Sequence, residues 1–91
     1  MAIAADSRPA LARGVRLMED KARGGWSLLA PERVLRLNAT SAAVLRLCDG
    51  SRPFAAILDE LAAAFEADRS VIERDARKLL TSLSDKLLVA L

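Results

Sequence analysis

The sequence predicts a small α+β domain of winged helix-turn-helix type, in which an N-terminal three-stranded antiparallel sheet is followed by three helices. Three observations predict this class. Apolar and polar residues alternate over short segments up to Leu37, and from Thr40 onward apolar residues recur with the period of a helix. Glycine and proline separate the segments. A chain of 91 residues is long enough for one domain only.

The strands are bounded by clear turn signals. Gly24-Gly25 ends a polar stretch, and Pro31-Glu32 provides a corner, because proline has a fixed φ and no N–H for a sheet ladder. Short strands joined by short connections favour an antiparallel meander. The strands are expected over Leu11–Met18, Trp26–Leu29 and Arg33–Leu37.

The first helix is expected over Thr40–Cys48. Asn38 and Thr40 both offer an N-cap, and Gly50 suits the left-handed residue that follows a helix. The next helix opens at Pro53, where a missing N–H costs nothing.

The third helix begins with Ser70-x-x-Glu73, which has the spacing of a capping box. Leu87-Leu88-Val89 adds a short strand or closes the core. The two helical stripes expected to be buried are Phe54, Ile57, Leu58, Leu61, Ala62 and Phe65, and then Ile72, Ala76, Leu79, Leu80 and Leu83.

Composition excludes several functions. The chain has no His, the commonest general base and metal ligand, and its one Cys cannot form an internal disulfide or a CxxC site. We therefore expect no catalytic residue, no metal ligand and no cofactor. There is no apolar run of bilayer length and no basic signal-peptide region, so a cytoplasmic protein without membrane contact is expected. Residues 1–8 are expected to form a flexible N-terminus, followed by a single domain over residues 9–91.

Three single residues each allow a structural and a functional interpretation. Cys48 stands among apolar helix residues, which favours a buried structural thiol over a reactive one. Glu32 is more easily explained as a corner carboxylate that accepts backbone N–H bonds than as a functional group. Trp26, the only Trp, is either a core residue, which we favour, or an anchor for a partner.

The third helix also permits a DNA-binding regulator of the winged-helix class as an alternative function. Its basic residues Arg69, Arg74, Arg77 and Lys78 would have to neutralise phosphates along one side. Interleaved acids oppose this, so no nucleic-acid partner is expected. A purely structural dimerisation module is a third alternative.

The strand Arg33–Leu37 is the sharpest functional candidate. As the third strand of a meander it lies at an edge, with unpaired N–H and C=O groups that an extended peptide can pair with. The alternative is an edge that Arg33 and Arg36 protect from any partner. The residues alone leave these two interpretations nearly even.

A longer pattern bears on that choice. Leu28-Leu29-Ala30-Pro31-Glu32, then Leu37-Asn38, then Cys48-Asp49-Gly50 resembles the pyrroloquinoline quinone biosynthesis protein D (PqqD) family. The resemblance extends from Pro9 to about Leu88. One departure is Asp85-Lys86, where the family often has Gly before its last hydrophobic pair.

The resemblance implies a winged helix-turn-helix fold and a stand-alone peptide-recognition element of ribosomal peptide modification, with one peptide-binding domain over residues 9–91. It implies a carrier, not an enzyme, that binds the precursor peptide PqqA and presents it to the radical SAM enzyme PqqE, which cross-links a Glu and a Tyr of the peptide. We expect a monomer in dilute solution that exchanges N-terminal strands through Gly24-Gly25 when concentrated. The implied peptide-binding residues are Arg33, Val34, Leu35, Arg36 and Leu37 on the edge strand, with Asp75 and Leu79 on the third helix.

Overall fold

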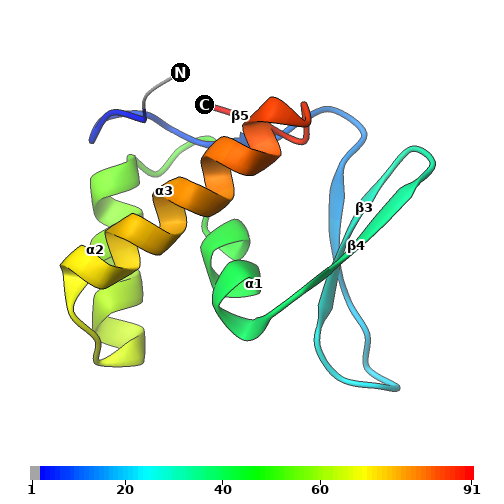
Figure 1. Cartoon of the computed structure of the whole chain (residues 1–91), viewed down its shortest axis with the longest axis horizontal. Helices are drawn as coiled ribbons and strands as arrows, with labels where there is room; N and C mark the ends of the chain where they lie inside the picture. The colour runs from blue at the N-terminus through cyan, green and yellow to red at the C-terminus, as the bar shows by residue number, and fades with distance from the viewer. Residues whose placement is uncertain (1–2) are drawn as a thin grey trace.

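A computed structural model describes residues 3–91 and contains two antiparallel sheets and three helices. A three-stranded sheet in the order β2-β3-β4 stands on one side of the molecule, and the helices occupy the other (Figure 1). The expected meander followed by three helices is confirmed. The elements are β1 (Ala10–Leu11), β2 (Arg16–Glu19), β3 (Trp26–Ala30), β4 (Arg33–Leu37), α1 (Ala39–Arg46), α2 (Phe54–Phe65), α3 (Arg69–Asp85) and β5 (Val89–Ala90).

The first strand of the meander is shorter than expected. The prediction of one strand over Leu11–Met18 is wrong, because a turn at Gly14, with φ of 82°, separates β1 from β2. The turn is closed by the Val15 N–H, which donates to the Ala12 carbonyl at 3.0 Å. Alternation alone did not mark this break. β1 instead pairs with β5, so Ala10 and Ala90 lie side by side.

The hairpin between β3 and β4 forms where the sequence indicates. Ala30 pairs with Arg33 across a two-residue loop of Pro31 and Glu32. Glu32 has φ of 62°, and a proline followed by a residue of positive φ is the pattern of a type II turn. The third predicted strand, Arg33–Leu37, has the bounds of β4.

The structure shows which residues cap the starts of α1 and α3. Asn38, not Thr40, caps α1, and its side-chain oxygen accepts from the Ser41 N–H at 2.7 Å. The capping box at Ser70 and Glu73 is wrong, since Asp68 precedes it and accepts from the Ser70 N–H at 2.9 Å. Hydrogen bonds from the backbone and side chain of Ser70 lower the pKa of Asp68.

The core lies between α1, α2, α3 and the inner face of the sheet. The α2 stripe is buried at Phe54, Ile57, Leu58 and Leu61, but Ala62 is only half-buried. Phe65, at the end of the stripe, is 43% exposed. Its predicted burial is therefore wrong. The main buried side chains are Leu28, Val44, Leu45, Cys48, Phe54, Ile57, Leu58, Leu61, Ile72, Ala76, Leu80, Leu83, Leu88 and Val89.

The N-terminal segment is held by the helices, although the sequence favours a loose end here. The Ser7 carbonyl accepts from the Phe54 N–H at 2.7 Å, and the Ala5 carbonyl accepts from the Ala55 N–H at 3.0 Å. Ile3 is buried, and its carbonyl accepts from the Arg77 guanidinium, which also lies over the Phe54 ring. Backbone carbonyls of residues 3–8 thus accept hydrogen bonds from the first N–H groups of α2.

Helix α3 ends in a Schellman motif that contains an unusual residue. The Leu88 N–H donates to the Leu83 carbonyl at 2.9 Å, and the Leu87 N–H donates to the Ser84 carbonyl at 2.9 Å. Leu87 itself has φ of 62°, where glycine is preferred, and its side chain is 82% exposed. The departure at Asp85-Lys86 therefore leaves the turn intact, with a leucine in the left-handed position.

Candidate functional site: an open sheet edge beside a helix

Strand β4 forms an open edge of the sheet, because β3 is the one strand of residues 3–91 that pairs with it. In a hairpin with a two-residue loop, the two residues beside the loop exchange backbone hydrogen bonds. Along the two strands, every second pair of facing residues then exchanges such bonds, and the pairs between them do not. Arg33, Leu35 and Leu37 therefore bond to β3. The backbone N–H and C=O groups of Val34 and Arg36 point outward, away from β3.

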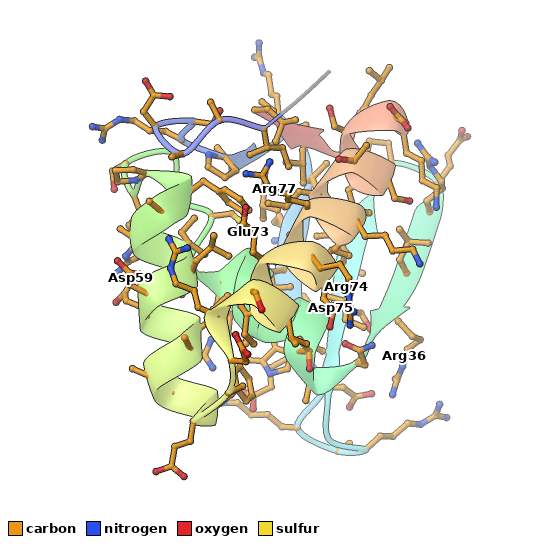
Figure 2. All side chains as sticks on the ribbon, turned by 60° about the vertical axis from the view of Figure 1, so that its left-hand side comes forward. Arg36, Asp59, Glu73, Arg74, Asp75 and Arg77 are labelled. Atoms are coloured by element: carbon orange, nitrogen blue, oxygen red, sulfur yellow. The ribbon has the colours of Figure 1, made fainter. Side chains whose placement is uncertain are left out.

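The second half of α3 lies opposite this edge. At one end, the Arg33 guanidinium donates to the Lys86 carbonyl at 3.1 Å. At the other end, α3 and the start of α1 enclose a hollow of about 410 Å³, which we call the β4–α3 groove. Its walls are Asn38, Thr40, Ser41, Val44, Asp75, Lys78, Leu79 and Ser82. In Figure 2, Arg74 and Asp75 lie on the side of α3 nearer β4, which carries Arg36.

The structure brings only part of the predicted site together. Asp75 and Leu79 both line the β4–α3 groove. The side chains of β4 do not line it, although Asn38, the next residue in the chain, does. The edge therefore contributes backbone groups, and α3 contributes side chains.

The β4 side chains divide between the two faces of the sheet. Leu35 and Leu37 are half-buried on the core face, where Leu35 is the partner of buried Leu28. Val34 is 66% exposed on the outer face, and Arg36 on the same face lies 3.6 Å from the Asp20 carboxylate. Arg36 is thus engaged with the β2–β3 loop, which weakens the expectation that it orients a peptide.

Lys78 and Ser82 line the groove as well, although neither was predicted as a site residue. They follow Asp75 at the spacing i+3 and i+7, so the four α3 residues of the groove, including Leu79, share one helix face. That spacing could have identified Lys78 and Ser82 from the sequence. Thr40 and Ser41 come from α1, and no pattern in the sequence joins them to α3.

The basic residues of α3 are poorly placed for DNA. Arg69 lies 2.7 Å from Asp59, Arg77 lies 2.8 Å from Glu73, and Arg74 lies 3.4 Å from Asp75. Among residues 3–91, Lys78 is the one basic side chain of α3 outside such a pair. A helix whose arginines are already neutralised has little charge left for phosphates.

Cys48 is a structural thiol, as predicted. It is buried, and its Sγ–H donates to the Val44 carbonyl at 3.2 Å. Burial, with a smaller contribution from the Asp49 charge, raises the pKa of the thiol to about 12. A thiol that stays protonated is a poor nucleophile.

Asp49 organises the connection from α1 to α2. Its carboxylate accepts from the Ser51 N–H at 2.9 Å and from the Ser51 hydroxyl at 2.9 Å, and it pairs with Arg52 at 3.1 Å. The backbone hydrogen bond from Ser51 is the main cause that lowers the pKa of Asp49 to about 2.

Neither Glu32 nor Trp26 has the environment that the sequence favoured for it. The Glu32 carboxylate is exposed and accepts no hydrogen bond from residues 3–91, so the expected corner bonds are absent. Trp26 is half-buried, and the Arg46 guanidinium lies 5.1 Å from its ring centroid.

Among residues 3–91, no group of three or more His, Cys, Asp or Glu side chains can hold a metal ion. No helix in this part of the chain is long and apolar enough to cross a membrane.

The fold and the groove together define a class: a small winged-helix-like domain whose sheet keeps one open strand beside its last helix. The family model described as "Coenzyme PQQ synthesis protein D (PqqD)" matches residues 25–89. The chain belongs to the PqqD family.

Curated relatives match over nearly the whole chain. A PqqA binding protein of Xanthomonas axonopodis pv. citri is 49% identical over 89 residues, which cover 98% of this chain and 97% of the relative. Another PqqA binding protein, from Rhodopseudomonas palustris strain TIE-1, is 45% identical over 94% of this chain and 84% of the relative.

Two solved structures share the fold. The solution NMR structure of the PqqD truncation of Methylobacterium extorquens PqqCD is 37% identical and has a TM-score of 0.85, over 99% of this chain and 96% of that one. It is described as a functional, stand-alone recognition element for ribosomally synthesised and post-translationally modified peptides. The crystal structure of PqqD from Xanthomonas campestris is 48% identical and has a TM-score of 0.62, over 98% of this chain and 99% of that one.

Proposed function

We propose that this chain is a peptide carrier of pyrroloquinoline quinone biosynthesis, which binds the precursor peptide PqqA and presents it to PqqE. The observation that carries the proposal is the open β4 edge, where Val34 and Arg36 direct unpaired backbone groups outward beside the β4–α3 groove. An extended peptide would add a fourth strand there. The names of the curated relatives support PqqA as that peptide.

The groove suits a peptide side chain of mixed character. Leu79 offers apolar surface, while Asp75 and Lys78 offer one charge of each sign. Main-chain pairing along β4 would supply affinity, and the groove would select side chains in alternate positions of the peptide.

We assign no catalytic residue, metal or cofactor to this protein, and the chemistry on the peptide belongs to PqqE. The buried free thiol of Cys48 fits a cytoplasmic location.

The experiment is a titration of the ¹⁵N-labelled chain with PqqA peptide, followed by amide chemical shifts. We expect the largest changes at Val34 and Arg36 and in the groove at Lys78 and Leu79. The opposite edge, where Glu19 directs its N–H outward, serves as the internal control. Changes confined to β2, or no binding at all, would contradict strand addition at β4. Cross-linking of PqqA by the chain without PqqE would contradict the carrier role.

We also propose that the chain is a monomer in dilute solution that exchanges N-terminal strands when concentrated. Gly24 and Gly25, with φ of 78° and 90°, link β2 to β3 in a turn that few other residues adopt.

Light scattering over a wide range of concentration tests this exchange. We expect the monomer at low micromolar concentration and a growing dimer fraction above it. The double variant Gly24→Ala with Gly25→Ala strains the closed turn and should shift the ratio of the two forms. A tight dimer at the lowest concentration, unaffected by the double variant, would show a dedicated interface instead.

A further inference from the structure

A second concave surface lies on the other side of α1 from the peptide groove. It consists of two adjoining hollows of about 400 and 460 Å³, which share Ala43, Arg46 and Phe65. We call it the α1–α2 hollow. Its remaining walls include Trp26 and Leu37 from the sheet, Leu47 from the end of α1 and Leu61 from α2.

Two of the three aromatic side chains of the molecule stand at this surface. Trp26 is half-buried, and Phe65 is 43% exposed although the stripe of α2 predicted its burial. Exposed aromatic side chains in a concave, largely apolar setting are typical of the anchors of protein interfaces. The third aromatic residue, Phe54, is fully buried, so the exposure of Phe65 is particular to this surface.

Arg52 and Glu60 also line the hollow, but they form an ion pair at 3.1 Å, so Arg46 determines its charge preference. The Arg46 guanidinium lies over the Trp26 ring, 5.1 Å from the centroid. The arginines of residues 3–91 that form ion pairs are Arg36, Arg52, Arg69, Arg74 and Arg77, and Arg46 is not among them. A guanidinium stacked on an aromatic ring keeps its N–H edge available for a carboxylate. The hollow therefore fits a carboxylate that is flanked by apolar side chains.

The hollow and the peptide groove meet only at Asn38, which lines both. The free groups of Val34 and Arg36 point away from β3, whereas the hollow lies on the β3 side, beneath Trp26 and Leu37. A peptide paired with the β4 edge would leave the hollow open. Both surfaces are then accessible at the same time.

We infer that the α1–α2 hollow docks a second protein, which places a carboxylate on Arg46 and an apolar side chain against Phe65, while the β4–α3 groove holds the peptide. This inference rests on the proposed function, in which the second protein is the enzyme that receives the peptide. Arg46 and Phe65 then determine the affinity for the enzyme and leave the affinity for the peptide unchanged.

The test measures two affinities for each variant, one for PqqA peptide and one for PqqE, by biolayer interferometry. Arg46→Glu should weaken PqqE binding at least tenfold, and Phe65→Ala should weaken it severalfold. Both should bind PqqA as the unaltered chain does. Arg13→Glu, an exposed charge reversal between β1 and β2, and Met18→Ala, 47% exposed on the outer face of the sheet, are the matched controls.

The outcomes are distinct. Unchanged PqqE binding in both hollow variants, with folding confirmed by circular dichroism, would overturn the inference. A parallel loss of PqqA binding would overturn it too, because the hollow would then belong to the peptide site. No PqqE binding by the unaltered chain would overturn docking and leave peptide capture standing, whereas failure to bind PqqA would refute the proposed function alone.

Discussion

Replacing Val34 by proline should abolish most of the affinity for PqqA while leaving the fold in place. The Val34 N–H points away from β3, so the proline removes a donor that the peptide needs and not one that the sheet needs. The pyrrolidine ring also obstructs the approach of a new strand. A lost backbone bond with its partner left unsatisfied costs about 1–3 kcal/mol, which is roughly a fivefold to 150-fold loss of affinity.

Two variants isolate the cause. Val34→Ala removes the exposed side chain and keeps the N–H, so it should bind PqqA almost normally. Glu19→Pro places a proline at an outward N–H of the opposite edge and should also bind normally. Leu35→Pro is a poor test, because Leu35 bonds to Leu28 within the ladder. If folded Val34→Pro binds PqqA as tightly as the unaltered chain, strand addition at β4 is wrong.

Truncating Phe54 should cost more stability than almost any other single change. The ring is fully buried between α2 and α3, and the Arg77 guanidinium covers it at 5.1 Å from the centroid. Phe→Ala in a core costs about 3–5 kcal/mol, a large part of the roughly 5–15 kcal/mol that holds an ordinary domain together. Urea unfolding followed by circular dichroism measures this loss.

Phe65→Ala is the matched comparison, because the same residue type stands at the other end of the same helix. Its loss should be clearly smaller than that of Phe54→Ala, since Phe65 is 43% exposed whereas Phe54 is fully buried. If Phe54→Ala is already unfolded without urea, Phe54→Leu gives a measurable intermediate value. Equal losses for Phe54→Ala and Phe65→Ala would mean that the burial described for this helix is wrong.

These two phenylalanines also show how far the sequence predicts the structure. Helical spacing places both on one apolar stripe, but spacing does not say which part of the stripe other elements cover. β4 was predicted with its full bounds, because Pro31 fixes one end and the cap residue Asn38 fixes the other. The strand from Leu11 to Met18 was wrong, because Gly14 breaks an alternation that continues on both sides of the turn.

The candidate site was predictable only where one element supplies its residues. Asp75 and Leu79 lie on the groove face of α3, and Lys78 and Ser82 follow from the same helical spacing. The α1–α2 hollow was not predictable, since Trp26, Arg46 and Phe65 come from three elements that only the tertiary fold brings together. Local patterns contain no information on such distant neighbours.

The pairing of β1 with β5 has a consequence for the order in which the chain folds. Ala10 pairs with Ala90, so this sheet closes a loop that contains nearly the whole protein (Figure 1). The β3–β4 hairpin, by contrast, needs a loop of only two residues and is complete while most of the chain is still unmade. Loop-closure entropy grows with loop length, so the long-range pair forms late and only with the rest of the fold to support it. During synthesis, β4 can therefore form early, whereas β1 has no β5 partner until Val89 and Ala90 have been made.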